Sequence, residues 1–205
     1  MKIIPANLSK RESHELFMSA IVPRPIAFVS TVGEDGVFNL APFSCFTSLC
    51  LKPALVGIHI GWKRNGEKKD TLRNIELSKD FVVNVVEEEL GAAMHRSSGE
   101  YPSHVDEFNE VGLTPVRSDL VKAPRVGESR VNMECKLFRI LEFGEAPTGG
   151  HLVVGEVILV HVKDELWSFD HIKMPQFKPI GRLGEELYCR ITNIFEMKGD
   201  LKFFA

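Results

Sequence analysis

The chain has 205 residues, a length that suits one globular domain and is enough to bury a hydrophobic core. Its charged content of 26% and net charge of −3 exclude a globally basic protein of the kind that binds nucleic acid or anionic membranes. No stretch approaches the roughly 20 apolar residues that span a bilayer, and no signal-peptide pattern opens the chain, so we expect a cytoplasmic protein.

The first predicted element is a helix that follows Ser9 and runs to about Ile21. Ser9 and Glu12 form a capping-box pattern, in which each side chain satisfies a free backbone N–H of the other residue. The PRP sequence that follows ends the helix, because proline disfavours helical geometry in the residue before it. The apolar run 26–32 and the GEDG turn at 33–36 then predict a β-hairpin.

The second strand of this hairpin continues into the segment Asn39–Leu49, NLAPFSCFTSL, which places hydroxyl groups and a thiol among aromatic residues. Read as one strand, the segment puts Phe43 and Cys45 on one face, and Ser44 and Phe46 on the other. It contains no acid or base. Two interpretations are open: an edge strand with solvated serines, or a polar strand edge that binds a flat heteroaromatic ligand.

A basic, glycine-containing loop follows the next apolar run. Its four cationic residues are Lys63, Arg64, Lys68 and Lys69. A short helix follows, with Asp70 as the predicted N-cap and Thr71 next to it. Helix N-termini favour phosphate, because their unpaired N–H groups carry a positive partial charge. A solvated charged loop is the alternative. Taken together with the polar strand edge, the loop is typical of a site for a mononucleotide such as FMN.

Further apolar runs predict strands at 54–60, 81–86, 131–141, 151–162 and near 188–195. Gly155 indicates a bulge or sharp bend. A helix is predicted at 87–95, and the long irregular segment 97–127 is of a kind that is usually functional. Many strands joined by short turns favour an antiparallel sheet closed into a barrel. We expect one domain over residues 1–205, with a core of about 20–195.

The four cysteines and seven histidines show neither a CxxC pair nor metalloprotease spacing. The sequence therefore predicts reduced thiols and no metal site. His59 lies inside an apolar run and is interpreted as a histidine of the sheet.

Three segments, in this order, resemble the flavin reductase-like family of FMN-binding split-barrel proteins. They are RPIAFVSTVGEDGVFNLAPFSCF (24–46), KKDTLRNI (68–75) and FKPIGRLGEELYCRI (177–191). The resemblance implies a mainly β fold, the FMN-binding split β-barrel, antiparallel and Greek-key-like, with a few peripheral helices. It also implies a homodimer with FMN at the subunit junction.

The resemblance further implies which residues surround the cofactor: Asn39, Ser44, Cys45, Phe46, Lys68, Asp70, Thr71, Phe177 and Arg182. Cys45 departs from the family, whose members commonly carry a large aromatic residue there. The smaller thiol could open room for a substrate, change the flavin potential, add a redox-active sulfur, or only fill space. Tyr101 and His104 resemble a loop near the flavin and could contact a substrate or nicotinamide; they could equally be surface residues.

The implied function is an oxidoreductase of flavin reductase type. Electrons from NADH or NADPH would pass through FMN, with the chemistry on flavin N5 and no catalytic side chain, to an acceptor. That acceptor could be free flavin, a redox partner protein or a flavin-dependent oxygenase. No GxGxxG fingerprint is present, so a nicotinamide would have to stack transiently on the flavin. The alternatives are an FMN-binding electron carrier without NAD(P)H activity and a non-catalytic ligand-binding barrel.

Overall fold

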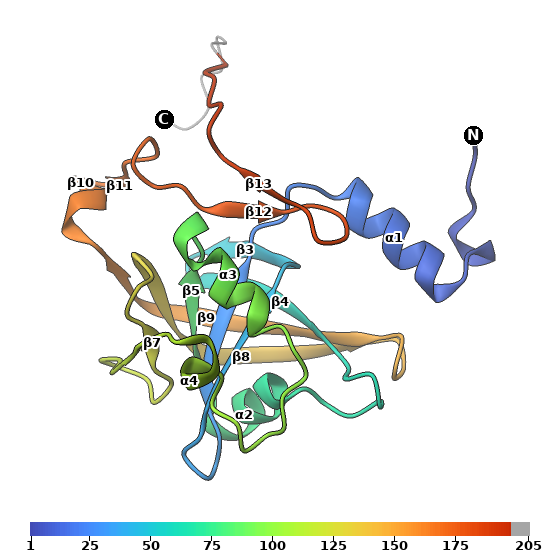
Figure 1. Cartoon of the computed structure of the whole chain (residues 1–205), viewed down its shortest axis with the longest axis horizontal. Helices are drawn as coiled ribbons and strands as arrows, with labels where there is room; N and C mark the ends of the chain where they lie inside the picture. The colour runs from blue at the N-terminus through green and yellow to red at the C-terminus, as the bar shows by residue number, and fades with distance from the viewer. Residues whose placement is uncertain (198–205) are drawn as a thin grey trace.

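The computed structural model describes residues 1–197, shown in Figure 1. Within this range lie four α-helices: α1 (Lys10–Ala20), α2 (Asp70–Ser78), α3 (Glu88–Arg96) and α4 (Glu107–Val111). The strands of the main sheet are β1 (Ala27–Val32), β2 (Phe38–Phe43), β3 (Phe46–Leu51), β4 (Ala54–Gly61), β5 (Asp80–Val85), β8 (Val131–Phe143) and β9 (Gly150–Val162). Residues 198–205 of the predicted domain lie outside the described residues.

Three small two-stranded sheets complete the strands of this part of the chain. They are β6 (Pro115–Val116) with β7 (Arg125–Val126), β10 (Trp167–Ser168) with β11 (His171–Ile172), and β12 (Ile180–Arg182) with β13 (Tyr188–Arg190). The segment 97–127, expected to be irregular, thus contains α4 and the β6–β7 pair. The final predicted strand ends at Arg190, earlier than expected.

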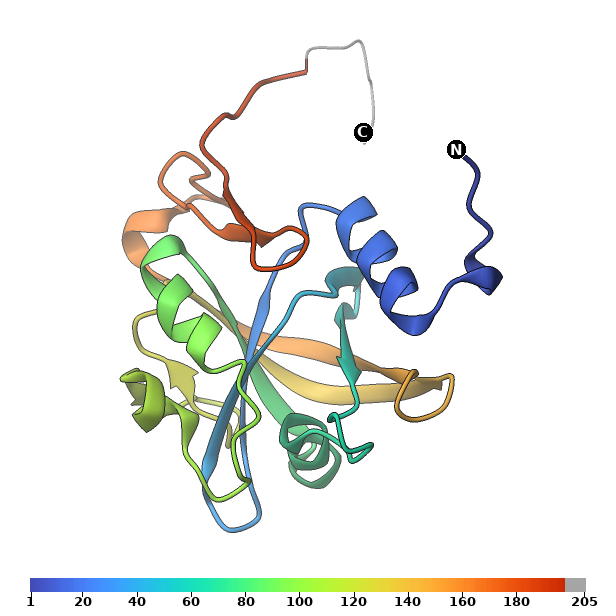
Figure 2. The same ribbon diagram turned by 45° about the vertical axis from the view of Figure 1, so that its right-hand side comes forward.

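The main sheet has the strand order β2-β1-β5-β8-β9-β4-β3, with antiparallel pairing throughout. Its two edge strands, β2 and β3, are joined by only Ser44 and Cys45. So short a link brings both edges of the sheet together, and the backbone oxygen of Cys45 accepts a hydrogen bond from the N–H of His59 at 2.9 Å. The sheet therefore curls into the barrel seen in Figures 1 and 2, which confirms the predicted fold class.

The corner at Ser44 and Cys45 corrects the sequence-based interpretation of Asn39–Leu49 as one strand. Phe43 is buried in the barrel core, and Phe46, on the far side of the corner, packs against the same core cluster. Strict alternation would have placed these two rings on opposite faces. Because the chain turns between them, both rings face the interior.

The barrel interior is filled by aliphatic and aromatic residues from the main sheet and α2, including Phe81, Ile58, Leu72, Ile75 and Val153. Gly155 permits a close approach here, because a Cβ at this position would lie 2.4 Å from the ring of Phe81. The ladder between β8 and β9 shifts register at Leu137/Arg139, next to Gly155. A second cluster, which includes Phe28, Leu40, Met94 and Phe108, packs α3 and α4 against the outside of β1 and β2.

Helix α1 forms as predicted, with both hydrogen bonds of the capping box between Ser9 and Glu12 in place. None of its residues is buried, and Figure 2 shows it standing beside the barrel. Helix α2 begins one residue earlier than expected, because Lys69 is its N-cap and Asp70 its first residue. Of the helices in residues 1–197, none combines the length and apolarity needed to cross a membrane.

Candidate functional site

A buried hydrogen-bond network is centred on Asn39, the second residue of β2. Its side-chain oxygen accepts from the Thr71 hydroxyl at 2.7 Å, and its Nδ2 donates to Oε1 of Glu107 at 2.8 Å. The other oxygen of Glu107 accepts the backbone N–H of Leu40 at 3.1 Å. All three side chains are more than nine-tenths buried. The network ties β2 to the starts of α2 and α4 and fixes the position of the Asn39 amide.

Glu107 is a buried acid in this network. Burial raises the pKa of its carboxyl to about 7, with the charge of Asp70 adding to the rise, against the hydrogen bonds from Leu40 and Asn39 that favour the ionised form. This residue was not singled out from the sequence, because nothing in its local pattern separates it from the acids on either side, Asp106 and Glu110. Only the packing of α4 against β2 shows that this acid points inward.

A cleft of about 120 Å³ lies above the network and is lined by Asn39, Thr71 and Glu107. Two cations also line it. Lys63 is paired with Asp70 at 2.6 Å, whereas Lys69 forms no ion pair within residues 1–197. The first turn of α2 has no side-chain cap, so its N–H groups are open to an anion. We call this site the Asn39 cleft.

A larger cavity of about 410 Å³ adjoins the Asn39 cleft, and Pro42 and Ser98 line both. Ser44, Arg24 and Arg182 are among its walls. Arg24 is buried and donates to backbone oxygens of α1 and of Leu183, so it joins α1 to the β12–β13 hairpin. The Arg182 guanidinium lies 4.5 Å from the ring centre of Tyr188, a cation–π contact.

The structure brings five of the nine predicted site residues to these two cavities. Asn39, Asp70 and Thr71 line the Asn39 cleft, and Ser44 and Arg182 line the larger cavity. Tyr101, named as a possible contact, also lines the cleft. The polar strand edge and the basic loop therefore meet at one site, as their sequence patterns predicted.

The remaining four predicted residues line neither cavity. Lys68 is paired with Glu76 at 2.6 Å, and Cys45 forms the corner between β2 and β3. Phe46 packs on the barrel core, and Phe177 is buried with Val131 and Leu166 in a separate cluster. His104 is also outside both cavities. Within a single chain, these side chains contribute to the fold around the site and do not line it.

Comparison with known proteins gives the family. A profile described as "Flavin reductase like domain" matches residues 18–173. The chain belongs to the flavin reductase-like family. The matched range of this flavin reductase-like domain contains the whole network of Asn39, Thr71 and Glu107, while Phe177 and Arg182 lie beyond it. The family predicted from the three sequence segments is thereby confirmed.

The flavin reductase-like chain has relatives among both sequences and solved structures. It is 37% identical over 186 residues to an uncharacterized protein of Aquifex aeolicus, covering 90% of this chain and 93% of that protein. Nitrilotriacetate monooxygenase component B from Bacillus cereus superposes with a TM-score of 0.91 at 32% identity, over 96% of this chain and 98% of that one. The 2-nitrobenzoate 2-nitroreductase of Pseudomonas fluorescens gives 0.89 at 28%, over 100% and 99%.

Proposed function

We propose that this flavin reductase-like protein binds FMN and transfers electrons from NADH or NADPH through it to an acceptor. The observation that carries the proposal is the junction of the Asn39 cleft with the larger cavity at Pro42 and Ser98. The two together offer a narrow end, whose lining includes Lys63 and Lys69 beside Asp70, Glu100 and Glu107, and a wide end lined by strand, arginine and aromatic groups. That shape and polarity suit a ring system with a phosphate tail.

The narrow end of the site, at the Asn39 cleft, would hold the phosphate. Lys69 and the uncapped first turn of α2 supply positive charge there, while the negative charge of Asp70 is neutralised by Lys63 and Arg73. The raised pKa of Glu107 leaves its carboxyl largely protonated below about pH 7, which limits repulsion of an anion. Asn39 and Thr71 hold this end rigid through their mutual hydrogen bond.

The wide end suits the ring. Ser44 and the Pro42 backbone offer polar contacts along one wall, and Arg182 with Tyr188 lies on another. Bound FMN would supply the capacity to accept a hydride and pass electrons onward, which no side chain of this site can do. The role of the residues is to bind, orient and exclude water.

The family supports this proposal, and so do the names of the relatives above 25% identity, a monooxygenase component and a nitroreductase. We also propose a cytoplasmic homodimer that serves a redox partner or a flavin-dependent oxygenase. Large apolar side chains are exposed on β3 and β8, where a second copy could cover them: Leu49, Leu51, Phe138, Leu141 and Phe143.

The test is the visible spectrum of the purified protein, titrated with FMN and then given NADH or NADPH without oxygen. We expect FMN to bind and its absorbance to bleach on reduction; light scattering on the same sample should give a dimer mass. FMN binding without bleaching by either donor would favour the electron carrier. A protein that binds no FMN would leave only a non-catalytic barrel.

A further inference from the structure

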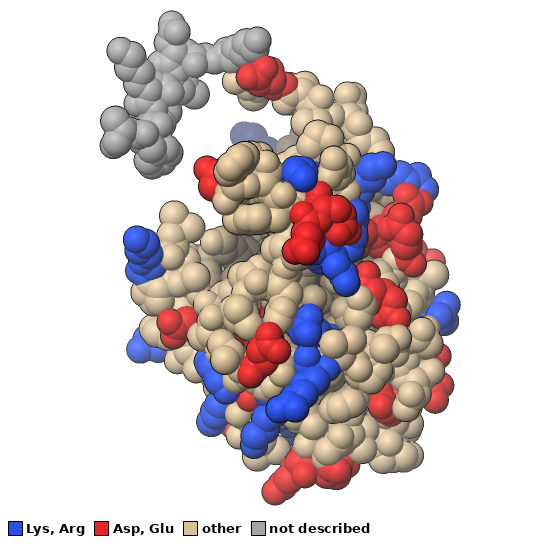
Figure 3. Space-filling view, turned by 90° about the vertical axis from the view of Figure 1, so that its left-hand side faces the viewer, with Lys and Arg blue, Asp and Glu red and all other residues tan. Residues whose placement is uncertain are grey.

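A groove of about 400 Å³ lies where β7, the start of β8 and the end of β9 meet. It shares no lining residue with the Asn39 cleft or the larger cavity. Its cationic walls are Arg125, Arg130 and Lys163, and no Asp or Glu lines it, although the chain as a whole has a net charge of −3. Figure 3 shows Lys and Arg side chains crossing this side of the molecule. We call it the Arg125 groove.

Two of these three cations lack a compensating charge. Arg130 is paired with Glu87 and also donates to the backbone oxygen of Gln176 at 2.8 Å. Lys163 forms no ion pair within residues 1–197, and neither does Arg125, which donates only to the backbone oxygen of Arg117 at 3.0 Å. The groove therefore presents about two uncompensated positive charges.

Arg125 also carries an orphaned donor. Its Nε is buried and has no hydrogen-bond partner. A buried N–H without an acceptor is destabilising, and an anionic oxygen would supply the missing partner. The planar guanidinium, with two donors on one edge, matches the spacing of two oxygens in a phosphate or carboxylate.

Apolar and polar groups complete the lining of the groove. Four valines line it, Val116, Val126, Val160 and Val162, beside Ser129, Asn132 and His161. Small-molecule sites commonly combine apolar walls with placed polar groups, within volumes of about 300–1,000 Å³. The Arg125 groove lies in this range of sizes and has a more polar lining than most. Its ligand should therefore combine a body that packs on the valines with an anionic group.

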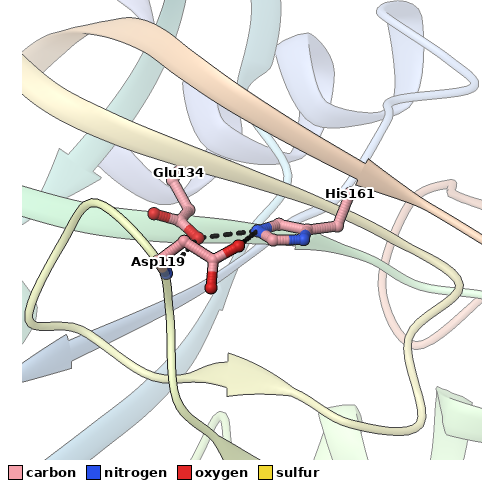
Figure 4. Close-up of side chains that lie close together, drawn as sticks. All are labelled: Asp119, Glu134 and His161. Atoms are coloured by element: carbon pink, nitrogen blue, oxygen red, sulfur yellow. Dashed lines mark hydrogen bonds and ion pairs between the residues drawn. The ribbon is translucent and has the colours of Figure 1, made fainter.

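His161 is the remaining ionisable side chain that lines the groove, and Glu134 fixes its position. Its Nε2 lies 2.6 Å from Oε1 of Glu134, which also accepts the backbone N–H of Asp119 at 2.8 Å (Figure 4). The second Glu134 oxygen accepts the N–H of Leu120 at 2.7 Å. Both oxygens of this buried carboxylate are thus engaged by donors. Glu134 therefore fixes the position of His161 in the groove wall, while the Asp119 carboxylate, 4.0 Å from His161 Nε2, is largely exposed.

We propose that the Arg125 groove is a second ligand site, which binds a small heteroaromatic molecule carrying a phosphate group, as in a nucleoside monophosphate. A phosphate monoester carries about 1.5 to 2 negative charges near pH 7. That matches the two uncompensated cations, whereas a carboxylate would neutralise only one. The valines would cover the base, and Arg125 Nε would gain its missing acceptor.

The test is calorimetric titration with AMP, at low salt, of protein that holds one equivalent of FMN and no free FMN. The bound FMN fills the Asn39 cleft, and free FMN is left out because it also carries a ring and a phosphate and would compete for the groove. We expect AMP to bind, Arg125→Gln and Lys163→Gln each to weaken it at least tenfold, and added salt to weaken it further. Arg139→Gln is the matched control, because this exposed arginine of β8 does not line the groove.

Two further ligands separate the contributions. Adenosine and inorganic phosphate should each bind more weakly than AMP, because each lacks one half of the recognised chemistry. Benzoate binding as tightly as AMP would overturn the assignment to phosphate. AMP binding that neither Arg125→Gln nor Lys163→Gln changes, or no AMP binding at all, would overturn the site. FMN affinity serves as the folding control, and its failure in the wild type would count against the proposed function alone.

Discussion

The Asn39 cleft and the Arg125 groove are both suited to anions, yet the charges that line them differ. The cleft is lined by charges of both signs: Lys63 with Asp70, Lys69 with no ion pair within residues 1–197, and the acids Glu100 and Glu107. The groove is lined by cations, valines and polar side chains, and no Asp or Glu lines it. Anion affinity in the cleft should depend on how the neighbouring acids are paired or protonated. Anion affinity in the groove should depend mainly on the salt concentration.

Because of this difference, substitutions in the two regions should have different effects. The cleft is rigid because its polar groups already bind each other, so changes within it should affect folding as well as binding. In the groove, the side chains of Arg125 and Lys163 form no ion pair within residues 1–197, so removing either charge should affect binding alone. The predictions below test this contrast, from the largest expected effect to the smallest.

Asn39→Ala should be the most damaging single change in the cleft. It removes the partners of Thr71 and of Glu107 at once, and both are buried. Each orphaned group costs about 2 kcal/mol, so we expect a loss of about 4 kcal/mol in the free energy of unfolding, measured by urea denaturation, together with weaker FMN binding. Asn109→Ala, in the exposed part of α4, is the control. A loss no larger than in that control would mean that the network does not stabilise the fold.

Glu107→Gln should instead change how stability depends on pH. Its amide nitrogen cannot accept the hydrogen bond of Asn39 or Leu40, so the variant loses one acceptor at every pH, but it has no carboxyl to ionise. The pKa of Glu107 is raised from 4.5 to about 7 in the folded state, so between these values the folded state binds more protons than the unfolded state. Stability contributed by the protonated carboxyl is therefore present at low pH and lost as pH rises toward 7. At 1.36 kcal/mol per pKa unit, the difference is about 3 kcal/mol.

The measurement is the free energy of unfolding of Glu107→Gln and wild type at pH 4 and pH 8. We expect the variant to gain about 3 kcal/mol on the wild type between the two pH values. Glu110→Gln, an exposed acid on the same helix, should gain far less. Parallel pH profiles for wild type and Glu107→Gln would show that Glu107 titrates as an ordinary surface acid and that the cleft has no pH dependence of this origin.

The two regions also differ in how far sequence could predict them. The polar strand edge and the start of the helix at Asp70 follow local patterns, and the family resemblance assigned Asn39, Asp70 and Thr71 to one site before the fold was known. The corner at Ser44 and Cys45 could not, because closure of the sheet overrides the alternation of a single strand. Glu107 was not predicted, because its burial arises from the packing of α4 and not from its neighbours in sequence.

For the Arg125 groove the sequence offered only the long irregular segment 97–127, which contains Arg125 but does not indicate a site of this kind. The walls of the groove come from β6 and β7, from the start of β8 and from the end of β9, and each segment looks like an ordinary solvated strand end. Only the fold brings Arg125, Arg130 and Lys163 together. A short motif can mark a site built from neighbouring residues; one assembled across the barrel becomes visible only in three dimensions.

The smallest predicted effect distinguishes two adjacent lysines. The sequence resemblance points to Lys68 as the phosphate ligand, whereas in the structure Lys68 is paired with Glu76 and Lys69 lines the cleft without a pair. We expect Lys69→Ala to weaken FMN binding about tenfold, or ~1.4 kcal/mol, since it removes one charge-assisted contact. Lys68→Ala should change the affinity less than about threefold, because exposed ion pairs contribute little. Fluorescence titration at fixed salt measures both.

Riboflavin sharpens this comparison, because it carries the same ring without the phosphate. If Lys69 acts on the phosphate, Lys69→Ala should leave riboflavin affinity unchanged while FMN affinity falls. Equal losses for both ligands would place Lys69 near the ring and reverse the orientation proposed for the cofactor. A larger loss from Lys68→Ala would mean that Lys68 leaves Glu76 when FMN arrives. The cleft would then rearrange its ion pairs on binding, in contrast to the Arg125 groove, whose two unpaired cations have no ion pair to break.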